Sequence, residues 1–267
     1  MTGDGKENAG PPVRPDGLSP QAPAAVTPRR EWLRRLAAAR RLWRAETVFV
    51  AALAAFAVLA FFARAYAYFE WDRATARALQ SLDLPGVHGL MYAASRLGDG
   101  WRPWALSGAA LLGFYLLRRR TEMFALLLSV GGGTVINRLM KWLIARPRPT
   151  VELVNVQREW RHESFPSGHV AFYVCFFGFL FFAAFALLPK KSLKRRAALT
   201  LTALPLLLIG LSRVYLGAHW PSDTLGAYLL SGVWLAFVVH QYRRWKARST
   251  FHAEEAETAG AKPGIKD

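Results

Sequence analysis

Three short segments of this 267-residue chain carry side chains whose types and spacing suit chemistry on an anionic ester. The first begins at Lys141 and ends at Arg148 and Pro149. Its two cations could hold the oxygens of a phosphate group, while Pro147 and Pro149 stop a helix and stiffen the chain. Stiffness matters because an arginine fork binds phosphate oxygens in a fixed geometry. Taken alone, the same cations would equally suit anchoring to lipid headgroups.

The second segment runs from Phe165 to His169 and directly precedes a long apolar run. Ser167 is a favourable N-cap residue, and the amides of Gly168 and His169 would point out of the start of the helix, where anions bind. His169 in the first turn could give a proton to a leaving oxygen. The alternative for this segment alone is an ordinary helix cap with an interfacial histidine.

The third segment holds Ser212, Arg213, His219 and Asp223. If residues 219–223 turn helically, the side chains of His219 and Asp223 share one face. The carboxylate can then hold one imidazole nitrogen as a donor and leave the other as a nucleophile. A histidine and an aspartate at this spacing are often structural, so the catalytic interpretation depends on the convergence of all three segments.

The elements that must position these segments are long apolar runs. Of all residues, 53% are hydrophobic, and they stand in uninterrupted stretches that only a bilayer or a very large core would hide. A core of that size does not fit in one domain of this length. The candidate spans are 47–69, 101–117, 123–144, 170–188, 197–211 and 224–240. The sequence therefore predicts an all-α integral membrane bundle of six transmembrane helices.

Basic residues set the orientation of the predicted bundle. They gather at 29–44, 118–120, 190–196 and 243–246, and these segments alternate so as to lie on one side of the membrane. The positive-inside rule makes that side cytoplasmic, so both termini are expected in the cytoplasm of a multi-pass protein of the cell membrane. The second and third chemical segments then belong to outside connections, which places the predicted active site at the outer, or periplasmic, face.

Composition divides the chain into three parts and excludes several classes of protein. Residues 1–28 are expected to be a disordered tail, residues 29–246 the membrane domain, and residues 247–267 a flexible cytoplasmic tail. The net charge is +17, but the basic residues lie between apolar runs and form no nucleic-acid-binding pattern, so no nucleic acid is expected as a partner. The single cysteine, Cys175, excludes an intrachain disulfide and a cysteine-based metal cluster.

Together, the three segments resemble the signature motifs of the type 2 phosphatidic acid phosphatase superfamily, which also contains bacterial acid phosphatases and vanadium haloperoxidases. The first motif is a lysine, six residues and Arg-Pro, the second is Pro-Ser-Gly-His, and the third is Ser-Arg, five residues, His, three residues and Asp. No position departs from these patterns. The matching residues are Lys141, Arg148 and Pro149, then Pro166, Ser167, Gly168 and His169, and finally Ser212, Arg213, His219 and Asp223.

The resemblance implies a role for each of these residues. His219 would attack phosphorus and form a phosphohistidine, oriented by Asp223, and His169 would protonate the leaving group and later activate water. The phosphate-binding residues would be Lys141, Arg148, Ser167, Gly168 and Arg213. Three cations and a helix N-terminus can neutralise the charge of a phosphoryl group in transfer. We therefore expect no metal or other cofactor.

The expected function is a phosphatase that hydrolyses a phosphomonoester or diphosphate of a membrane lipid. Candidate substrates are undecaprenyl diphosphate, phosphatidate, phosphatidylglycerol phosphate and lipid A phosphates, and the partners are this lipid and the bilayer. Two alternatives share the fold: a vanadate-dependent haloperoxidase, whose known relatives are soluble, and a lipid-binding or transport protein without catalysis. Intact His169, His219 and Asp223 favour the enzyme, because phosphate binding alone would not require them.

Overall fold

The computed structural model describes residues 28–82, 84–158 and 162–260. In these ranges every regular element is a helix, which confirms the all-α prediction. The helices are α1 (Pro28–Ala65), α2 (Glu70–Gln80), α3 (Val87–Arg96), α4 (Arg102–Leu116), α5 (Arg120–Ile144), α6 (Gly168–Leu187), α7 (Leu193–Tyr215) and α8 (Pro221–Gly260). The chain divides into two units, Met1–Val48 and Phe49–Asp267, and the second holds all the predicted site residues. The predicted tail 1–28 lies outside the described residues except for Pro28.

In the described part of the chain, 5 helices are long and apolar enough to cross a membrane. They are the stretch Glu46–Ala65 of α1, the whole of α5, α6 and α7, and the stretch Pro221–Arg248 of α8. The predicted span at 101–117 corresponds to α4, which has 15 residues, fewer than the ~20 that usually cross a bilayer. The multi-pass membrane fold is confirmed, while the count of six spans stays a prediction.

Several predicted helix ends differ from the observed ones. The first span ends at Ala65 instead of residue 69, because Phe69 instead precedes α2 and its backbone N–H donates to Asp72 Oδ2 at 3.2 Å. At the other end of the chain, α8 runs on to Gly260, past the predicted boundary at residue 246. Hydropathy marks where apolar residues stop, whereas a helix continues for as long as its backbone hydrogen bonds are made.

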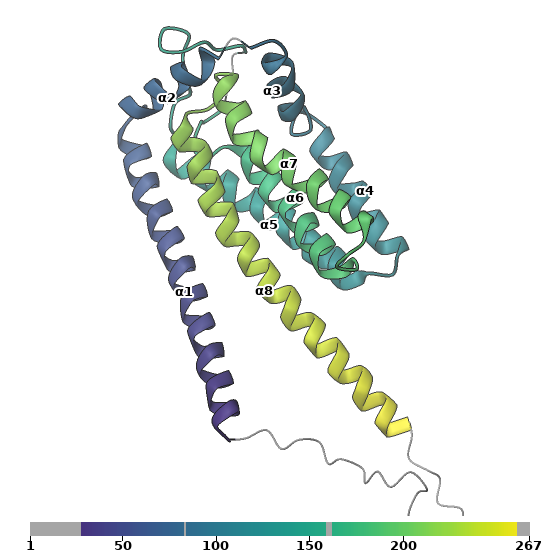
Figure 1. The fold of residues 1–267 in the computed structure, drawn as a ribbon. Helices are drawn as coiled ribbons and strands as arrows, with labels where there is room; N and C mark the ends of the chain where they lie inside the picture. Colours follow the sequence, from purple (N-terminus) through teal and green to yellow (C-terminus); the bar gives the residue numbers. More distant parts are fainter. Residues whose placement is uncertain (1–27, 83, 159–161, 261–267) are drawn as a thin grey trace, which may run out of the picture. The chain divides into compact units, whose positions relative to one another are not determined.

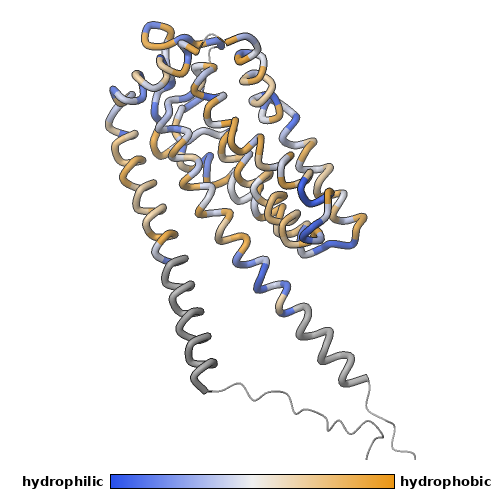
Figure 2. Tube along the Cα trace, viewed as in Figure 1, coloured by the Kyte–Doolittle hydropathy of each residue, from blue (hydrophilic) through white to orange (hydrophobic). Residues whose placement is uncertain are grey.

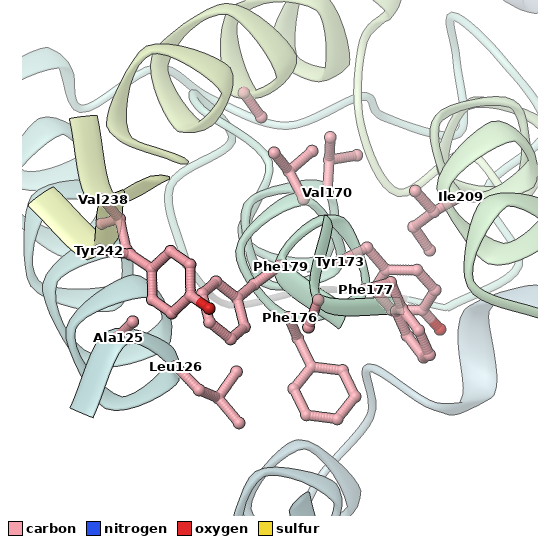
Figure 3. Close-up of a cluster of buried hydrophobic side chains, with 13 residues drawn as sticks. Ala125, Leu126, Val170, Tyr173, Phe176, Phe177, Phe179, Ile209, Val238 and Tyr242 are labelled. Atoms are coloured by element: carbon pink, nitrogen blue, oxygen red, sulfur yellow. The ribbon is translucent and has the colours of Figure 1, made fainter. Parts of the chain in front are cut away.

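The apolar core of the bundle is centred on α6. This helix is apolar on all its faces, which is typical of a helix surrounded by others. Tyr173, Phe176 and Phe179 are buried among side chains from α5, α7 and α8, including Leu126, Ile209 and Val238 (Figure 3). The packing fixes the position and rotation of α6, and therefore of Gly168 and His169 in its first turn.

One end of the bundle is covered by α2 and α3, and the α4–α5 and α6–α7 turns lie at the opposite end (Figure 1). Hydropathy along the chain shows the same division, with mostly apolar helices and hydrophilic turns (Figure 2). The sequence predicts only a connection over about 70–100, so both helices are additions. Their attachment is specific: Gln80 of α2 donates to the carbonyl of Asn155 at 2.7 Å and accepts from its amide at 3.0 Å.

Candidate active site

His219 lies in the short turn between α7 and α8, with a different partner at each ring nitrogen. The Arg148 guanidinium approaches Nε2 at 3.3 Å, and the Ser164 hydroxyl approaches Nδ1 at 3.4 Å. A guanidinium can only donate hydrogen bonds, so Nε2 is the acceptor and the proton of the neutral ring belongs on Nδ1. The unprotonated nitrogen therefore faces the cation, on the side where a phosphate would bind.

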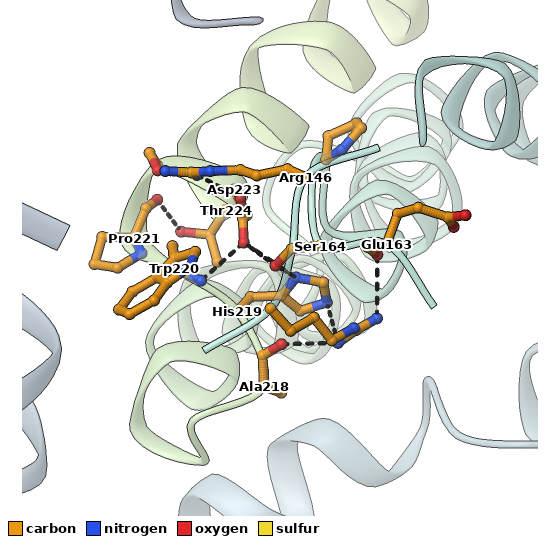
Figure 4. A network of polar contacts seen from close by, with 12 residues as sticks. Arg146, Glu163, Ser164, Ala218, His219, Trp220, Pro221, Asp223 and Thr224 are labelled. Atoms are coloured by element: carbon orange, nitrogen blue, oxygen red, sulfur yellow. Dashed lines mark hydrogen bonds and ion pairs between the residues drawn. The ribbon is translucent and has the colours of Figure 1, made fainter. Parts of the chain in front are cut away.

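Asp223 is fully buried in the first turn of α8, four residues after His219. The predicted pairing with the imidazole is present at 3.5 Å between Asp223 Oδ2 and His219 Nδ1, longer than a good hydrogen bond. Ser164 donates to the same carboxylate oxygen, and the backbone N–H of Trp220 donates to it at 2.8 Å (Figure 4). Ser164 thus connects the carboxylate to the histidine, a contact that no motif position predicts.

The other oxygen of Asp223 belongs to a buried ion-pair network. Arg146 donates to Asp223 Oδ1 at 2.7 Å, to Ser222 Oγ at 2.6 Å and to Asp72 Oδ2 at 2.9 Å. Asp72 comes from α2 and also accepts from the backbone N–H of Ser222 at 2.8 Å. Arg146 and both carboxylates are buried, so their charges are balanced inside the protein and not by water. We call these four residues, Asp72, Arg146, Ser222 and Asp223, the charge network.

Lys141 and Arg148 converge on the segment that precedes α6. Lys141 Nζ donates to the carbonyls of Glu163 and of Ser164, the latter at 3.2 Å. Arg148 donates to the carbonyls of His162 at 2.5 Å and Ala218 at 2.7 Å. These carbonyls fix the two cationic side chains beside His219. The arrangement agrees with the predicted phosphate-binding role.

The start of α6 lies beside Lys141. Ser167 occupies the N-cap position and its side chain is buried, but its hydroxyl makes no capping hydrogen bond. Gly168 is so placed that an added Cβ would lie 3.5 Å from Asn137 Oδ1 and 3.9 Å from Lys141 Cε. The helix N-terminus therefore opens next to the lysine ammonium, where both can attract one anion.

His169 contacts the α3–α4 connection, and Arg213 contacts the last turn of α3. His169 Nε2 is 2.8 Å from Asp99 Oδ1, and Arg213 donates to Ser95 Oγ at 2.5 Å. Asp99 is a further residue that the motifs do not contain. Because its carboxylate accepts a hydrogen bond from Nε2–H, the proton that the imidazolium form of His169 would deliver to a leaving group is the one on Nδ1.

Burial and nearby charges shift the pKa of three groups that lie in the segments connecting the helices of the site. Burial, reinforced by nearby positive charges, holds the pKa of His219 well below its ordinary value, so the ring is neutral at pH 7. Burial also lowers the pKa of Arg148 to about 10, which leaves the guanidinium charged. Burial acts to raise the pKa of Asp99, but the hydrogen bond and charge of His169 outweigh it, so the carboxylate is ionised.

The donor set of the site suits an anion. Among the described residues, no group of three or more His, Cys, Asp or Glu side chains could hold a metal ion. The side chains that do converge are cations and imidazoles, with the open N-terminus of α6 beside them. All eight residues predicted for the site thus lie around one region, at the end of the bundle where α2 and α3 lie.

Fold and site together define a class, the multi-pass membrane phosphatases. Residues 122–247 match the PAP2 superfamily, and this region holds all eight residues predicted for the site. The chain is 27% identical over 168 residues to phosphatidylglycerophosphatase B of Bacillus subtilis, covering 63% of this chain and 81% of the relative. The predicted family is confirmed.

Solved structures support the same fold. A transmembrane PAP2-type phosphatidylglycerolphosphate phosphatase from Bacillus subtilis matches with a TM-score of 0.64 and 25% identity, over 73% of this chain and 96% of that one. LpxE from Aquifex aeolicus matches with a TM-score of 0.50 and 24% identity, over 64% of this chain and 96% of that one. The second likeness concerns the fold alone. Asp72 and Asp99 lie before residue 122, outside the region matched by the family.

Proposed function

We propose that this membrane lipid phosphatase of the PAP2 type works through a phosphohistidine on His219. His219 Nε2 would attack the terminal phosphorus of a lipid phosphate, and the bond from phosphorus to the bridging oxygen would break. The bridging oxygen would leave with the lipid and take a proton from His169. Water, deprotonated by His169, would then attack the phosphohistidine, release inorganic phosphate and restore both histidines.

The observation that supports this proposal most directly is that the two ring nitrogens of His219 have different partners. Nε2 faces Arg148 at 3.3 Å, whereas Nδ1 faces Ser164 at 3.4 Å and Asp223 at 3.5 Å. A nucleophile needs an unprotonated nitrogen on the side of the electrophile and a partner for the positive charge that develops on the ring. The arrangement meets both needs.

The phosphoryl oxygens would be held by Lys141, Arg148, Arg213, Ser167 and the amide of Gly168. Equatorial oxygens gain negative charge during transfer, and fixed cations stabilise that charge more in the transition state than in the bound substrate. Asp99 would hold the His169 ring with one proton directed toward the leaving oxygen. These roles account for each predicted site residue and need no metal.

We further propose that the substrate is a lipid phosphate reached from the outer leaflet, with both termini cytoplasmic. Basic segments at 118–120 and 190–196 lie at or beside the α4–α5 and α6–α7 turns, opposite the site, and by the positive-inside rule we expect that end in the cytoplasm. The relatives named for phosphatidylglycerol phosphate support that lipid as one candidate, beside phosphatidate and undecaprenyl diphosphate.

The central test is trapping of the intermediate. Purified protein in detergent is mixed with a lipid phosphate labelled on the terminal phosphorus, quenched after milliseconds, and assayed for protein-bound label that is stable to alkali and lost in acid. We expect such label in the wild type and in His169→Gln, where the intermediate should accumulate, and none in His219→Gln. Equal labelling of His219→Gln would remove that residue from the nucleophile role, and absence of turnover on every lipid phosphate would refute the proposed function.

A further inference from the structure

A cavity of about 320 Å³ lies between α4, α5 and α6 and extends from the active site into the membrane-spanning part of the bundle. Lys141, Gly168 and His169 form part of its wall. Since His169 is proposed to protonate the leaving oxygen, this cavity lies on the side of the site where the lipid leaving group must be. Its lining therefore determines which leaving group fits.

Most of the lining is apolar, but Arg138 also belongs to it. Arg138 is exposed and lies within the membrane-spanning helix α5. In the described part of the chain its side chain makes neither a hydrogen bond nor an ion pair, and Glu163 lines an adjoining groove together with it. A charged side chain in such a helix costs about 2.5–3.5 kcal/mol near the bilayer centre unless an anion or the interface compensates it. Among the described residues no carboxylate pairs with Arg138, so a bound anion would compensate its charge.

Ser107 gives an independent sign of a polar ligand in the same cavity. Its side chain comes from α4 and is only 8% exposed, and its hydroxyl has no hydrogen-bond partner. A buried hydroxyl without a partner is costly, and such groups are normally satisfied. Ser107 and Arg138 line the cavity from different helices, so a polar group bound there could contact both.

The position of Arg138 along α5 specifies where this polar group lies. Arg138 precedes Lys141 by three residues on a helix that runs toward the active site, so it lies roughly 4.5 Å deeper along the helix axis and on a neighbouring face. The terminal phosphate belongs beside Lys141 and His219. A second phosphate, between the terminal phosphate and the lipid chain, would then lie deeper, beside Arg138.

We propose that Arg138 binds the phosphate that remains with the lipid, and that the preferred substrate is a lipid diphosphate. This inference rests on the proposed function and adds the identity of the leaving group. Attack by His219 on the terminal phosphorus breaks its bond to the bridging oxygen, which departs as part of the lipid monophosphate. Arg138 stabilises the charge that this monophosphate gains, and water then releases the terminal group as inorganic phosphate.

A second source of the same chemistry is the phosphodiester of phosphatidylglycerol phosphate, which lies a glycerol unit away from the scissile phosphate. A third is the headgroup of a neighbouring membrane lipid that is not a substrate. The three sources can be told apart by measurement. If Arg138 binds the second phosphate of a diphosphate, its substitution should slow cleavage of a diphosphate more than cleavage of a monophosphate. The diphosphate and the monophosphate that are compared must therefore carry the same lipid chain.

The test is phosphate release from farnesyl diphosphate, farnesyl monophosphate and phosphatidylglycerol phosphate by the full-length protein in the same detergent micelles. Arg138→Gln should lower the ratio of kcat/KM for farnesyl diphosphate over farnesyl monophosphate at least about tenfold, as expected for loss of a charged hydrogen bond. Arg138→Lys should restore part of this ratio. Arg96→Gln is the matched control: it removes an exposed arginine from the same end of the bundle, outside the cavity, and should leave the ratio unchanged.

Each other result overturns the inference. An equal loss on all three substrates would make Arg138 an anchor to the bilayer, and a loss confined to phosphatidylglycerol phosphate would assign it to the phosphodiester. A wild-type protein that cleaves the monophosphates but not farnesyl diphosphate would refute the diphosphate assignment and leave the proposed function intact. Failure to cleave any of the three would instead refute the proposed function itself.

Discussion

Arg146 and Arg148 stand on either side of Pro147 and contact opposite ends of the pair formed by His219 and Asp223. Arg146 is buried and bonded to two carboxylates, Asp72 and Asp223, at 2.9 and 2.7 Å. Arg148 donates instead to backbone carbonyls and to the His219 ring. The first guanidinium lies between two buried carboxylates, whereas the second is half-buried beside the nitrogen that we propose as the nucleophile.

The difference shows that a short motif can supply two arginines with separate tasks. A cation paired with two buried carboxylates holds elements together, and removing one partner leaves a buried charge without compensation. A half-buried cation beside the reacting group can instead stabilise charge in the transition state. Substitutions at the two positions should therefore separate stability from catalysis.

The largest effect is expected for Arg148. Arg148→Gln should lower kcat by about 10³-fold, because an arginine that stabilises a transferring phosphoryl group is typically worth that much or more. The thermal unfolding temperature of the purified variant should stay close to that of the wild type. Phosphate release and a melting curve from the same preparation decide the matter. Loss of folding together with activity would show that Arg148 is structural, like Arg146.

The matching change at Arg146 should act mainly on stability. Arg146→Gln leaves Asp72 and Asp223 buried without their cation and should cost about 3–5 kcal/mol in the free energy of unfolding. Asp72→Asn tests whether α2 is held by the same network. In a double-mutant cycle the two losses should be far from additive, because both changes break one ion pair. Additive losses would mean that Asp72 and Arg146 act independently.

Ser164 should show a smaller effect, at the boundary between the two regions. Ser164→Ala removes the hydroxyl between Asp223 and the Nδ1 of His219, while Arg146 and the Trp220 amide still hold the carboxylate. We expect kcat to fall about tenfold with little change in KM, as for loss of one hydrogen bond to a charged group. Ser164→Thr retains the hydroxyl and is the control. Unchanged kcat in Ser164→Ala would show that Asp223 orients the ring directly.

The smallest effect concerns the dependence of stability on pH. Because the pKa of folded His219 is held below its ordinary value of 6.5, the unfolded chain binds a proton at this residue at a higher pH than the folded protein does. His219 therefore does not change the free energy of unfolding above pH 6.5, and it lowers that free energy as the pH drops below this value. Melting temperatures of the wild type and His219→Gln, measured from pH 8 to pH 5, should diverge below pH 6.5, with the wild type losing more. Parallel curves would contradict a depressed pKa.

Several features could be predicted from the sequence because their signals are local. Apolar runs of bilayer length predict the membrane helices, and the spacings within the segments of Lys141, Ser167 and His219 predict the residues that converge at the site. Each motif is short enough for its geometry to follow from one helix end or one turn. Motif spacing also predicts that Arg148 belongs to the site, and its guanidinium lies 3.3 Å from His219 Nε2.

The partners of those residues were decided only by the tertiary structure. Ser222 and Asp72 are separated by 150 positions and His169 and Asp99 by 70, so no periodicity or spacing connects them. Arg146 stands within the first motif at a position the motif leaves unspecified, and its task depends on carboxylates supplied by α2 and α8. The sequence by itself determined which residues are predicted to carry the chemistry, because the motif spacing is local. Which charges are neutralised and which remain for the substrate depends on side chains brought together by packing, and only the fold brings them together.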